Sequence, residues 1–319
     1  MFEVRIVLLP VALPPFPFAL PARPLTTPLS ARPLLPAYAA LGATLILWAV
    51  SFPATKVAMA AFHPGELALL RFALSSVALL VYTRHLELPL PDLADMPRLA
   101  ATGLLTVTVY QLGFNFGLQS VSSGPAAVLI DTIPIWTALL GALLLKERIR
   151  AWGWAGLVLG FAGAALIALG EGGVRFDLGQ GAALLLIAAL AFAAATVVQK
   201  PLLPKYGAVG VTTWSFLFGT LGLIWAVPGL LPQLEAAPRG AVLCVVFLAL
   251  FPGALAYLLW NHALARLPVA LAASSLYLIP PLTFAVAWVW LGEAPGLLSW
   301  IGGAVALAGV ALVQLQGKA

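Results

Sequence analysis

Asp131 is the carboxylate with the clearest chemical potential in this sequence, because apolar residues flank it in AAVLIDTIPIW (126–136). If its apolar stretch is a helix that starts at Ser123, Asp131 lies about 12 Å along the axis. A charge at that depth in a membrane costs at least about 2.5 kcal/mol, so it should face water or a partner. Such a carboxylate can carry a proton or balance an amine on a substrate. The alternative is a hydrogen-bonded structural group that holds nearby threonines.

A basic residue within an apolar stretch is the second candidate. Arg71 interrupts LALLRFAL (67–74) and could pair with Asp131, with Glu66 or with an anionic substrate. Lys56 and Lys200 stand at the ends of apolar stretches, where a long side chain can reach the membrane surface. Arg71 is therefore the basic residue that we carry forward.

Polar and aromatic residues at matching places could line a solute pathway. Gln111 shares a helix face with Asn115, four residues later, and could face a cavity or bond to a neighbouring helix. Trp48, Tyr110 and Tyr277 could wall a site for an apolar solute, although aromatic belts at membrane interfaces use the same residues.

Three prolines and two glutamates are candidates for structural or gating roles. Pro134, Pro280 and Pro281 should interrupt two helices beside Asp131 and Tyr277, and broken helices at matching places indicate a transporter's site; a packing kink is the alternative. Glu147 and Glu293 end two apolar stretches, which favours a structural or gating role.

The elements that position these residues are membrane helices. The chain has 319 residues, of which 62% are hydrophobic and 8% charged, whereas soluble proteins have about 25% charged residues. Apolar stretches of about 20 residues are long enough to cross a bilayer, and they lack the alternation of a β-barrel strand. The sequence predicts an all-α integral membrane protein with ten spans: 38–58, 65–83, 98–118, 123–145, 152–169, 179–199, 210–231, 239–260, 269–291 and 296–315.

The charged residues predict the topology. Residues 1–36 are so rich in proline that we expect a disordered tail, with a signal peptide as the alternative. With the N-terminus inside, only Lys56, Arg175 and Arg239 of the 16 Lys and Arg fall outside, and Arg71 falls within a span. This positive-inside bias predicts that both termini are cytoplasmic. We expect the protein in the plasma or inner membrane.

The second half of the chain repeats the first. A shift of 146 residues aligns the following pairs: Asn115 with Asn261, Pro134 with Pro280, Glu147 with Glu293, Gly156 with Gly302, and Gly163 with Gly309. Nearer the start, a shift of 144 aligns Lys56 with Lys200 and Phe72 with Phe216. We expect two five-helix repeats, 37–170 and 171–319. Because five is odd, the copies should be inverted, which is the architecture of alternating access.

The motifs LLLKERI (143–149), WLGEAPG (290–296) and LWAVSFPATK (47–56) resemble those of EamA-type transporters of the drug/metabolite transporter superfamily. Ala49 stands where many members have glycine, and Ala294 replaces the basic residue that follows the glutamate in the first motif. The resemblance covers residues 38–315 and implies a carrier or exporter of small metabolites, amino acids or drug-like compounds.

Other function classes fit less well. An embedded enzyme needs two or more convergent titratable groups, and the sequence has no HExxH, GxSxG or P-loop motif. A passive pore would show rows of polar groups. We therefore predict a secondary-active transporter, not an enzyme, with a small-molecule substrate, lipid around it, possible proton coupling through Asp131, and no cofactor, metal or nucleic acid. Substrate identity and oligomeric state stay open.

Overall fold

Helices make up the secondary structure of this computed structural model, which describes residues 34–88, 90–121, 123–170, 179–283 and 296–316. The described residues belong to one unit, Pro33–Ala319, and contain no β-strand. The elements, with η for π and 3₁₀ turns, are α1 (Leu35–Met59), α2 (Pro64–His85), α3 (Met96–Gly103), η2 (Leu104–Val109), α4 (Tyr110–Ser120), α5 (Ser123–Ile130), α6 (Ile133–Leu144), α7 (Ala151–Gly170), α8 (Gln180–Gln199), η3 (Lys200–Leu202), α9 (Leu203–Leu221), η4 (Ile224–Ala226), α10 (Val227–Ala236), α11 (Arg239–Leu248), η5 (Ala249–Leu255), α12 (Ala256–Leu264), α13 (Val269–Ser274), η6 (Ser275–Leu278) and α15 (Leu297–Gln316).

Among the described residues, 7 helical segments are long and apolar enough to cross a membrane. They are Pro64–His85, Met96–Ser120, Ala126–Leu144, Ala151–Leu169, Gln180–Leu221, Arg239–Leu264 and Leu297–Leu315. Two shorter apolar helices, Leu35–Ser51 and Val269–Thr283, accompany them, and Gln180–Leu221 has 42 residues, about twice the length of one crossing. The all-helical membrane class is confirmed, whereas the count of ten spans is not.

Local sequence explains where the helices begin and end. In α2, Pro64 occupies the first turn, where its missing N–H has no partner to lose, and Glu66 follows in the same turn. Arg84 and His85 stand in the last turn, so that the charges at both ends oppose the helix dipole. Between these ends α2 is mostly apolar and long enough to cross a membrane.

Two predicted boundaries differ from the structure. α1 begins at Leu35, within the range expected for the tail, because Pro36 is tolerated in a first helical turn; residues 1–33 lie outside the described part. The predicted span 210–231 is wrong as a single helix, since α9 ends at Leu221 and α10 begins at Val227. Pro228 cannot continue a preceding helix, because its ring clashes with the carbonyl four residues earlier.

Irregular turns recur at matching places in the two halves of the chain. The π-helical turn η2 covers Leu104–Val109 and the π-helical turn η5 covers Ala249–Leu255, which a shift of 146 residues places over one another. The fourth predicted span is broken between α5 and α6, and the ninth passes through the 3₁₀ turn η6. The regular α-helix is therefore interrupted at equivalent sequence positions in both halves.

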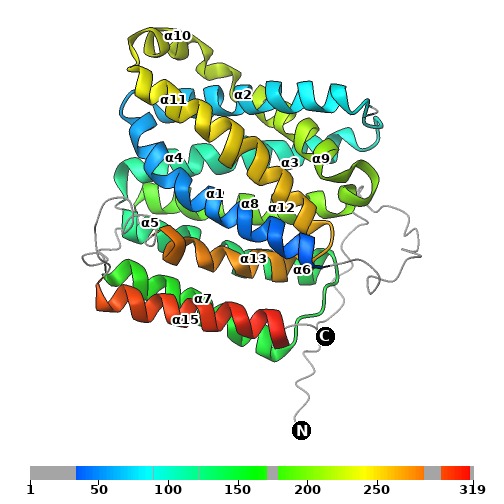
Figure 1. The fold of residues 1–319 in the computed structure, drawn as a ribbon, viewed down its shortest axis with the longest axis vertical. Helices are drawn as coiled ribbons and strands as arrows, with labels where there is room; N and C mark the ends of the chain where they lie inside the picture. Colours follow the sequence, from blue (N-terminus) through cyan, green and yellow to red (C-terminus); the bar gives the residue numbers. More distant parts are fainter. Residues whose placement is uncertain (1–33, 89, 122, 171–178, 284–295, 317–319) are drawn as a thin grey trace. The chain divides into compact units, whose positions relative to one another are not determined.

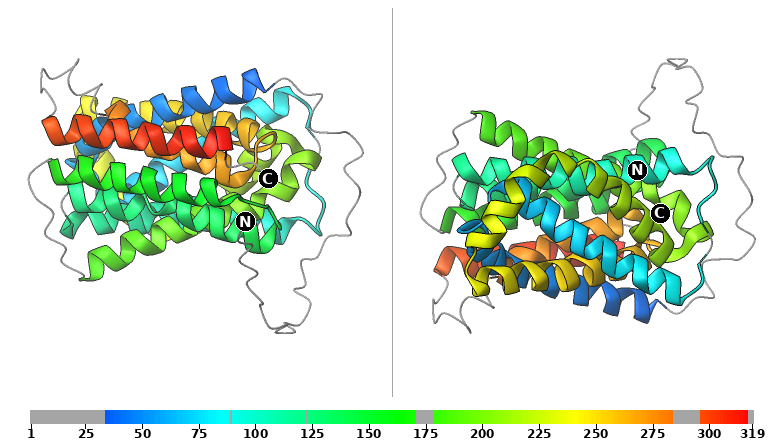
Figure 2. Two further views of the ribbon diagram at one scale, coloured as in Figure 1. Left: turned by 90° about the horizontal axis from the view of Figure 1, so that it is seen from below. Right: turned by 90° about the horizontal axis from the view of Figure 1, so that it is seen from above.

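The helices α7 and α15 run side by side in Figure 1 and in the left view of Figure 2. A Cβ on Gly156 would lie 2.8 Å from the carbonyl oxygen of Gly309, and one on Gly302 would lie 2.7 Å from that of Gly163. These are reciprocal contacts, since the repeat aligns Gly156 with Gly302 and Gly163 with Gly309. A two-fold relation between the two helices produces contacts of this kind.

Residues aligned by the shift of 144 also touch one another. The rings of Trp48 and Phe192 lie 5.9 Å apart, and those of Phe72 and Phe216 lie 5.0 Å apart. The hydroxyls of Ser76 and Thr220 share a 3.0 Å hydrogen bond. A two-fold relation between the halves would bring equivalent residues together in this way.

Candidate functional site

Asp131 lies in the break between α5 and α6. Its backbone N–H donates to the Ala127 carbonyl at 2.8 Å, which ends α5, and α6 restarts with Pro134 in its first turn. The side chain is half-buried, and its Oδ2 is buried without a hydrogen-bond partner. Thr132 donates to Leu129 instead, and Thr108 to Gly219. Within the described residues, no threonine holds the carboxylate in place.

Two tyrosines lie close enough to Asp131 to interact with it electrostatically. Tyr110 follows the π turn η2, and Tyr277 belongs to the 3₁₀ turn η6. Tyr277 is fully buried against α7, where a Cβ on Gly160 would lie 2.5 Å from its ring. Its hydroxyl is buried and has no partner among the described residues. The irregular turns thus bring two phenols towards one carboxylate.

Arg71 in α2 is the cationic counterpart of this group. It interacts electrostatically with Tyr257 and with Tyr110, so Tyr110 lies within reach of both Arg71 and Asp131. The guanidinium Nε is buried and has no partner among the described residues. Neither Asp131 nor Glu66, both described, forms the ion pair with Arg71 that the sequence allowed. A half-buried cation and a half-buried anion therefore lie near one tyrosine without forming an ion pair.

Aromatic rings enclose one side of this polar group. Trp48 contacts Phe192, Tyr257 and Trp260, with ring centroids 5.9, 5.3 and 5.5 Å away, and its Nε1 donates to the Pro252 carbonyl at 3.1 Å. That carbonyl belongs to the π turn η5. The ring of Tyr110 lies 5.1 Å from that of Phe192, which joins it to the same cluster. Trp48 and Tyr110 are thus core aromatic residues and not part of an interface belt.

The amides on the matched helices α4 and α12 are mostly structural. Asn115 donates to the Pro64 carbonyl at 3.0 Å, and Asn261 donates to the Thr212 hydroxyl at 2.9 Å. Gln111 is buried in α4 beside Tyr110. Gln111 directly follows Tyr110 in the chain.

Glu147 lies between α6 and α7 and binds the start of α13. Both of its carboxylate oxygens accept the Val269 N–H at 3.0 Å, at the start of α13, and the positive φ of 56° at Lys146 directs the chain there. Lys200 donates to the carbonyls of Leu264 and Leu267, at the end of α12, and also interacts electrostatically with Glu147. Lys200 therefore points into the protein and does not extend to the membrane surface.

The remaining predicted residues divide between described and undescribed positions. Pro134 is buried in the first turn of α6, while Pro280 and Pro281 are half-buried just after η6. Glu293, the partner of Glu147 in the repeat, lies outside the described residues. No group of three or more His, Cys, Asp or Glu that could hold a metal occurs in the described part of the chain.

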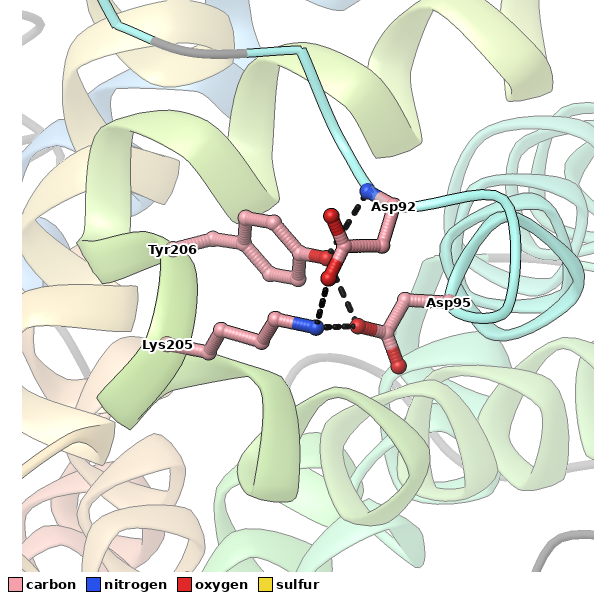
Figure 3. A network of polar contacts seen from close by, with 4 residues as sticks. All are labelled: Asp92, Asp95, Lys205 and Tyr206. Atoms are coloured by element: carbon pink, nitrogen blue, oxygen red, sulfur yellow. Dashed lines mark hydrogen bonds and ion pairs between the residues drawn. The ribbon is translucent and has the colours of Figure 1, made fainter.

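A network of charges that sequence reasoning missed joins the segment before α3 to α9 (Figure 3). Lys205 pairs with Asp92 at 2.5 Å and also with Asp95, while the Tyr206 hydroxyl donates to Asp95 at 2.6 Å. Burial raises the pKa of Asp95, but the hydrogen bonds from Lys205 and Tyr206 outweigh burial and hold that pKa below its ordinary value. More than 100 residues separate the partners, so no local pattern signals the network.

Comparison with known proteins gives this arrangement its context. A protein named "Probable terminal-alkyne amino-acid exporter" from Streptantibioticus cattleyicolor is 36% identical over 86% of this chain and 92% of its own. The "Uncharacterized transporter YdfC" of Bacillus subtilis is 33% identical over 85% of this chain and 88% of its own. The "Uncharacterized inner membrane transporter YedA" of Escherichia coli is 28% identical over 89% of this chain and 92% of its own.

A solved crystal structure shares the fold. Its TM-score is 0.72 at 20% sequence identity, and the match covers 88% of this chain and 96% of the other. The model of the EamA-like transporter family matches twice, at residues 35–169 and 179–315. The family match agrees with the motifs noted in the sequence, and the resemblance to EamA-type transporters of the drug/metabolite transporter superfamily is confirmed. This multi-pass membrane protein belongs to the EamA-like transporter family.

Proposed function

We propose that this chain is a secondary-active transporter that exports small metabolites, amino acids or drug-like compounds by alternating access, with Asp131 as the coupling group. The observation that carries the proposal is the position of Asp131, whose Oδ2 is buried and unpartnered in a break between two apolar helices. An unpaired carboxylate there costs stability, which a role in binding a proton or a substrate explains.

The proposed architecture is ten spans in two inverted repeats, 37–170 and 171–319. The reciprocal contacts between α7 and α15, the meeting of equivalent residues near Phe72 and Phe216, and the paired π turns all support it. Inverted copies have two packings of nearly equal energy, one open to each side. Exchange between these packings moves a solute across the membrane.

Competition for Asp131 provides the coupling. When Asp131 is protonated, its negative charge is gone and a cationic group on the solute loses its partner. When Asp131 is ionised, it attracts that group again. A carboxylate that holds either a proton or the solute exchanges one for the other across the membrane. Tyr110 and Tyr277, the titratable groups that interact with Asp131, can stabilise the ionised form by donating hydrogen bonds.

The name of the relative from Streptantibioticus cattleyicolor supports export and amino-acid substrates. The name of the Escherichia coli relative supports location in an inner membrane. The distribution of Lys and Arg supports cytoplasmic termini. Relatives named as transporters favour transport over enzymatic activity.

Counterflow into proteoliposomes tests the proposal. We expect purified protein to exchange a labelled amino acid and to accelerate net flux when a pH gradient is imposed. In Asp131→Asn we expect gradient-driven flux to fall by about 100-fold, within the range found when a proton-transfer group is removed. Glu235→Gln, which removes an exposed carboxylate at the end of α10, is the matched control and should keep wild-type flux. Equal dependence on the gradient in Asp131→Asn and wild type would contradict the coupling role.

A further inference from the structure

We propose that the network of Asp92, Asp95, Lys205 and Tyr206 is a latch that closes one end of the transporter and opens in each transport cycle. This inference rests on the proposed alternating access and assigns a gate to it. The residues come from both halves of the chain, because the aspartates precede α3 while the lysine and tyrosine lie early in α9 (Figure 3). A contact that joins the halves at one end must break whenever that end opens.

The aspartates serve the contact between the halves and not their own helix. Asp95 stands directly before α3, where a carboxylate usually caps free N–H groups, yet its side chain makes no such bond. Its carboxylate instead accepts hydrogen bonds from Lys205 and, at 2.6 Å, from the Tyr206 hydroxyl. The same hydroxyl accepts the Asp92 N–H at 3.1 Å. Side chains and backbone of the first half are thus joined to two consecutive residues of the second.

A kink separates Lys205 and Tyr206 from the rest of α9. At Gly207 the backbone leaves helical geometry, with φ 66° and ψ 177°. A residue with a Cβ is strained at this positive φ, whereas glycine is not. Because the helical geometry is interrupted here, a change in the backbone angles of one glycine suffices to swing both side chains away from the aspartates.

An apolar cluster occupies the place where the repeat would put a second network. The shift of 144 residues aligns Tyr206 with Phe62, and the shift of 146 aligns Asp95 with Ala241. Phe62 and Ala241 belong to one buried apolar cluster, which also joins the first half to the second. Phe62 precedes α2, whereas Asp92 follows it, and a helix of 22 residues is about 33 Å long. The two contacts therefore lie at opposite ends of α2. With the proposed cytoplasmic termini, the latch closes the cytoplasmic end.

The two contacts differ in what their opening costs. Lys205 and Asp92 are already 49% and 66% exposed, and Asp95 exchanges its partners for water when the latch opens. Opening the other contact brings the ring of Phe62, which is 2% exposed, into water, and this loses its apolar burial. Salt weakens the exposed ion pair but not the apolar contact. The latch is therefore the closure that opens more readily and that responds to ionic strength.

A thiol behind the latch reports its opening. Thr83 is buried in the last turn of α2, and its hydroxyl shares a 2.8 Å hydrogen bond with that of Thr213 in α9. Thr83→Cys in a Cys244→Ser background leaves one thiol in the chain. We would measure the rate at which a charged methanethiosulfonate labels this thiol in the full chain in nanodiscs. The measurement needs no substrate.

Changes at the two ends should have opposite effects on labelling. Lys205→Gln removes both ion pairs and should speed labelling by about fivefold, the scale expected for an ion pair that water reaches. Phe62→Ala loosens the other contact, draws the population away from the state that is open at the latch, and should slow labelling. Loss of fold would speed labelling in both variants. Glu235→Gln, an exposed change in α10, should leave the rate unchanged.

Cross-linking tests whether the latch must open for transport. In Asp92→Cys with Lys205→Cys, also made in the Cys244→Ser background, a reducible bis-methanethiosulfonate replaces the ion pair by a covalent tether. The tether should lower counterflow of labelled amino acids at least about tenfold, because alternation needs this end to open, and dithiothreitol should restore it. Arg84→Cys with Glu87→Cys is the matched control. These exposed residues share one turn at the same end, where the Glu87 N–H donates to the Arg84 carbonyl at 3.2 Å, and their tether should leave counterflow unchanged.

Two results would overturn the inference. One is an equal labelling rate of Thr83→Cys with and without Lys205→Gln. The other is counterflow that persists while Asp92→Cys and Lys205→Cys are cross-linked. In either case the network would be a static brace, and measured counterflow would leave the proposed transport function intact. Absence of counterflow before cross-linking would count against the transport function, and the labelling rates would still decide whether the latch opens.

Discussion

Charged residues behave differently in two regions of this protein. In the network between α9 and the segment before α3, Lys205 pairs with Asp92 and Asp95. The Tyr206 hydroxyl donates a hydrogen bond to Asp95, so each ionic group has a partner. In the apolar helices, Arg71 and Asp131 have opposite charges near one tyrosine and form no ion pair among the described residues. The Arg71 guanidinium lies over the Phe72 ring, 5.3 Å from its centroid.

This difference separates charges that join two segments of the protein from charges that can bind a ligand. The exposed pair of Lys205 and Asp92 contributes at most about 1 kcal/mol. Asp95 is buried, and its bonds from Lys205 and Tyr206 replace the hydration that it has lost. A buried ion without a partner costs several times more, and a protein retains it only when something else requires it. Incomplete pairing in the interior therefore identifies a binding site better than the presence of charge does.

The largest expected effect on stability follows from neutralising the interior charges. Asp131→Asn and Arg71→Gln should each stabilise the ligand-free protein by about 1 to 3 kcal/mol, because each replaces an ionic side chain that has no ion pair by a neutral amide, which costs less to bury. Thermal unfolding of both variants in the same detergent measures this. A clear loss of stability in either variant would show that the residue has a structural partner, and the contrast between the two regions would fail.

An intermediate effect is expected at Glu147, whose half-buried carboxylate accepts the Val269 N–H with both oxygens. Glu147→Gln should destabilise the protein by about 1 kcal/mol, because the charge at the start of α13 and the attraction to Lys200 are lost. Thermal unfolding beside Arg148→Gln, an exposed neighbour, provides the measurement and its control. No difference between the two variants would place Glu147 among the dispensable surface charges.

Asp95 should show a smaller effect with a defined pH dependence. Its pKa is lowered in the folded protein, so the stability it contributes is complete above the ordinary pKa of about 4 and is lost as pH falls further. Asp95→Asn should cost less than about 1 kcal/mol at neutral pH and progressively less as pH falls below about 4. Melting curves of both proteins across this pH range should converge on the acidic side; a constant gap would assign the effect to packing.

The smallest effect is expected at Asp92, whose side chain is 66% exposed. Asp92→Asn should leave the melting temperature within experimental error, because Lys205 keeps Asp95 as a partner and solvent screens the lost pair. Measurements at low and high salt sharpen the test. A large destabilisation at high salt would mean that the pair of Asp92 with Lys205 does not act as a solvated ion pair.

Much of the architecture could be predicted from hydropathy and periodicity. Each predicted span contains helical residues of the described structure, because apolar segments in lipid must satisfy their backbone hydrogen bonds internally. The break at Asp131 was also foreseeable, since Pro134 follows three residues later. The division of 210–231 into α9 and α10 was missed because the apolar character continues through Pro228.

Residue types and spacing by themselves determined that this chain is a helical membrane protein, that its halves are related, and that Asp131 and Arg71 are costly where they stand. They did not determine which groups meet. That Arg71 and Asp131 share Tyr110, that Lys200 caps α12, and that Lys205 reaches Asp92 and Asp95 depends on how helices from distant parts of the chain pack. Hydropathy acts along the chain and fixes depth in the membrane, whereas charge pairing acts across helices and needs the tertiary structure.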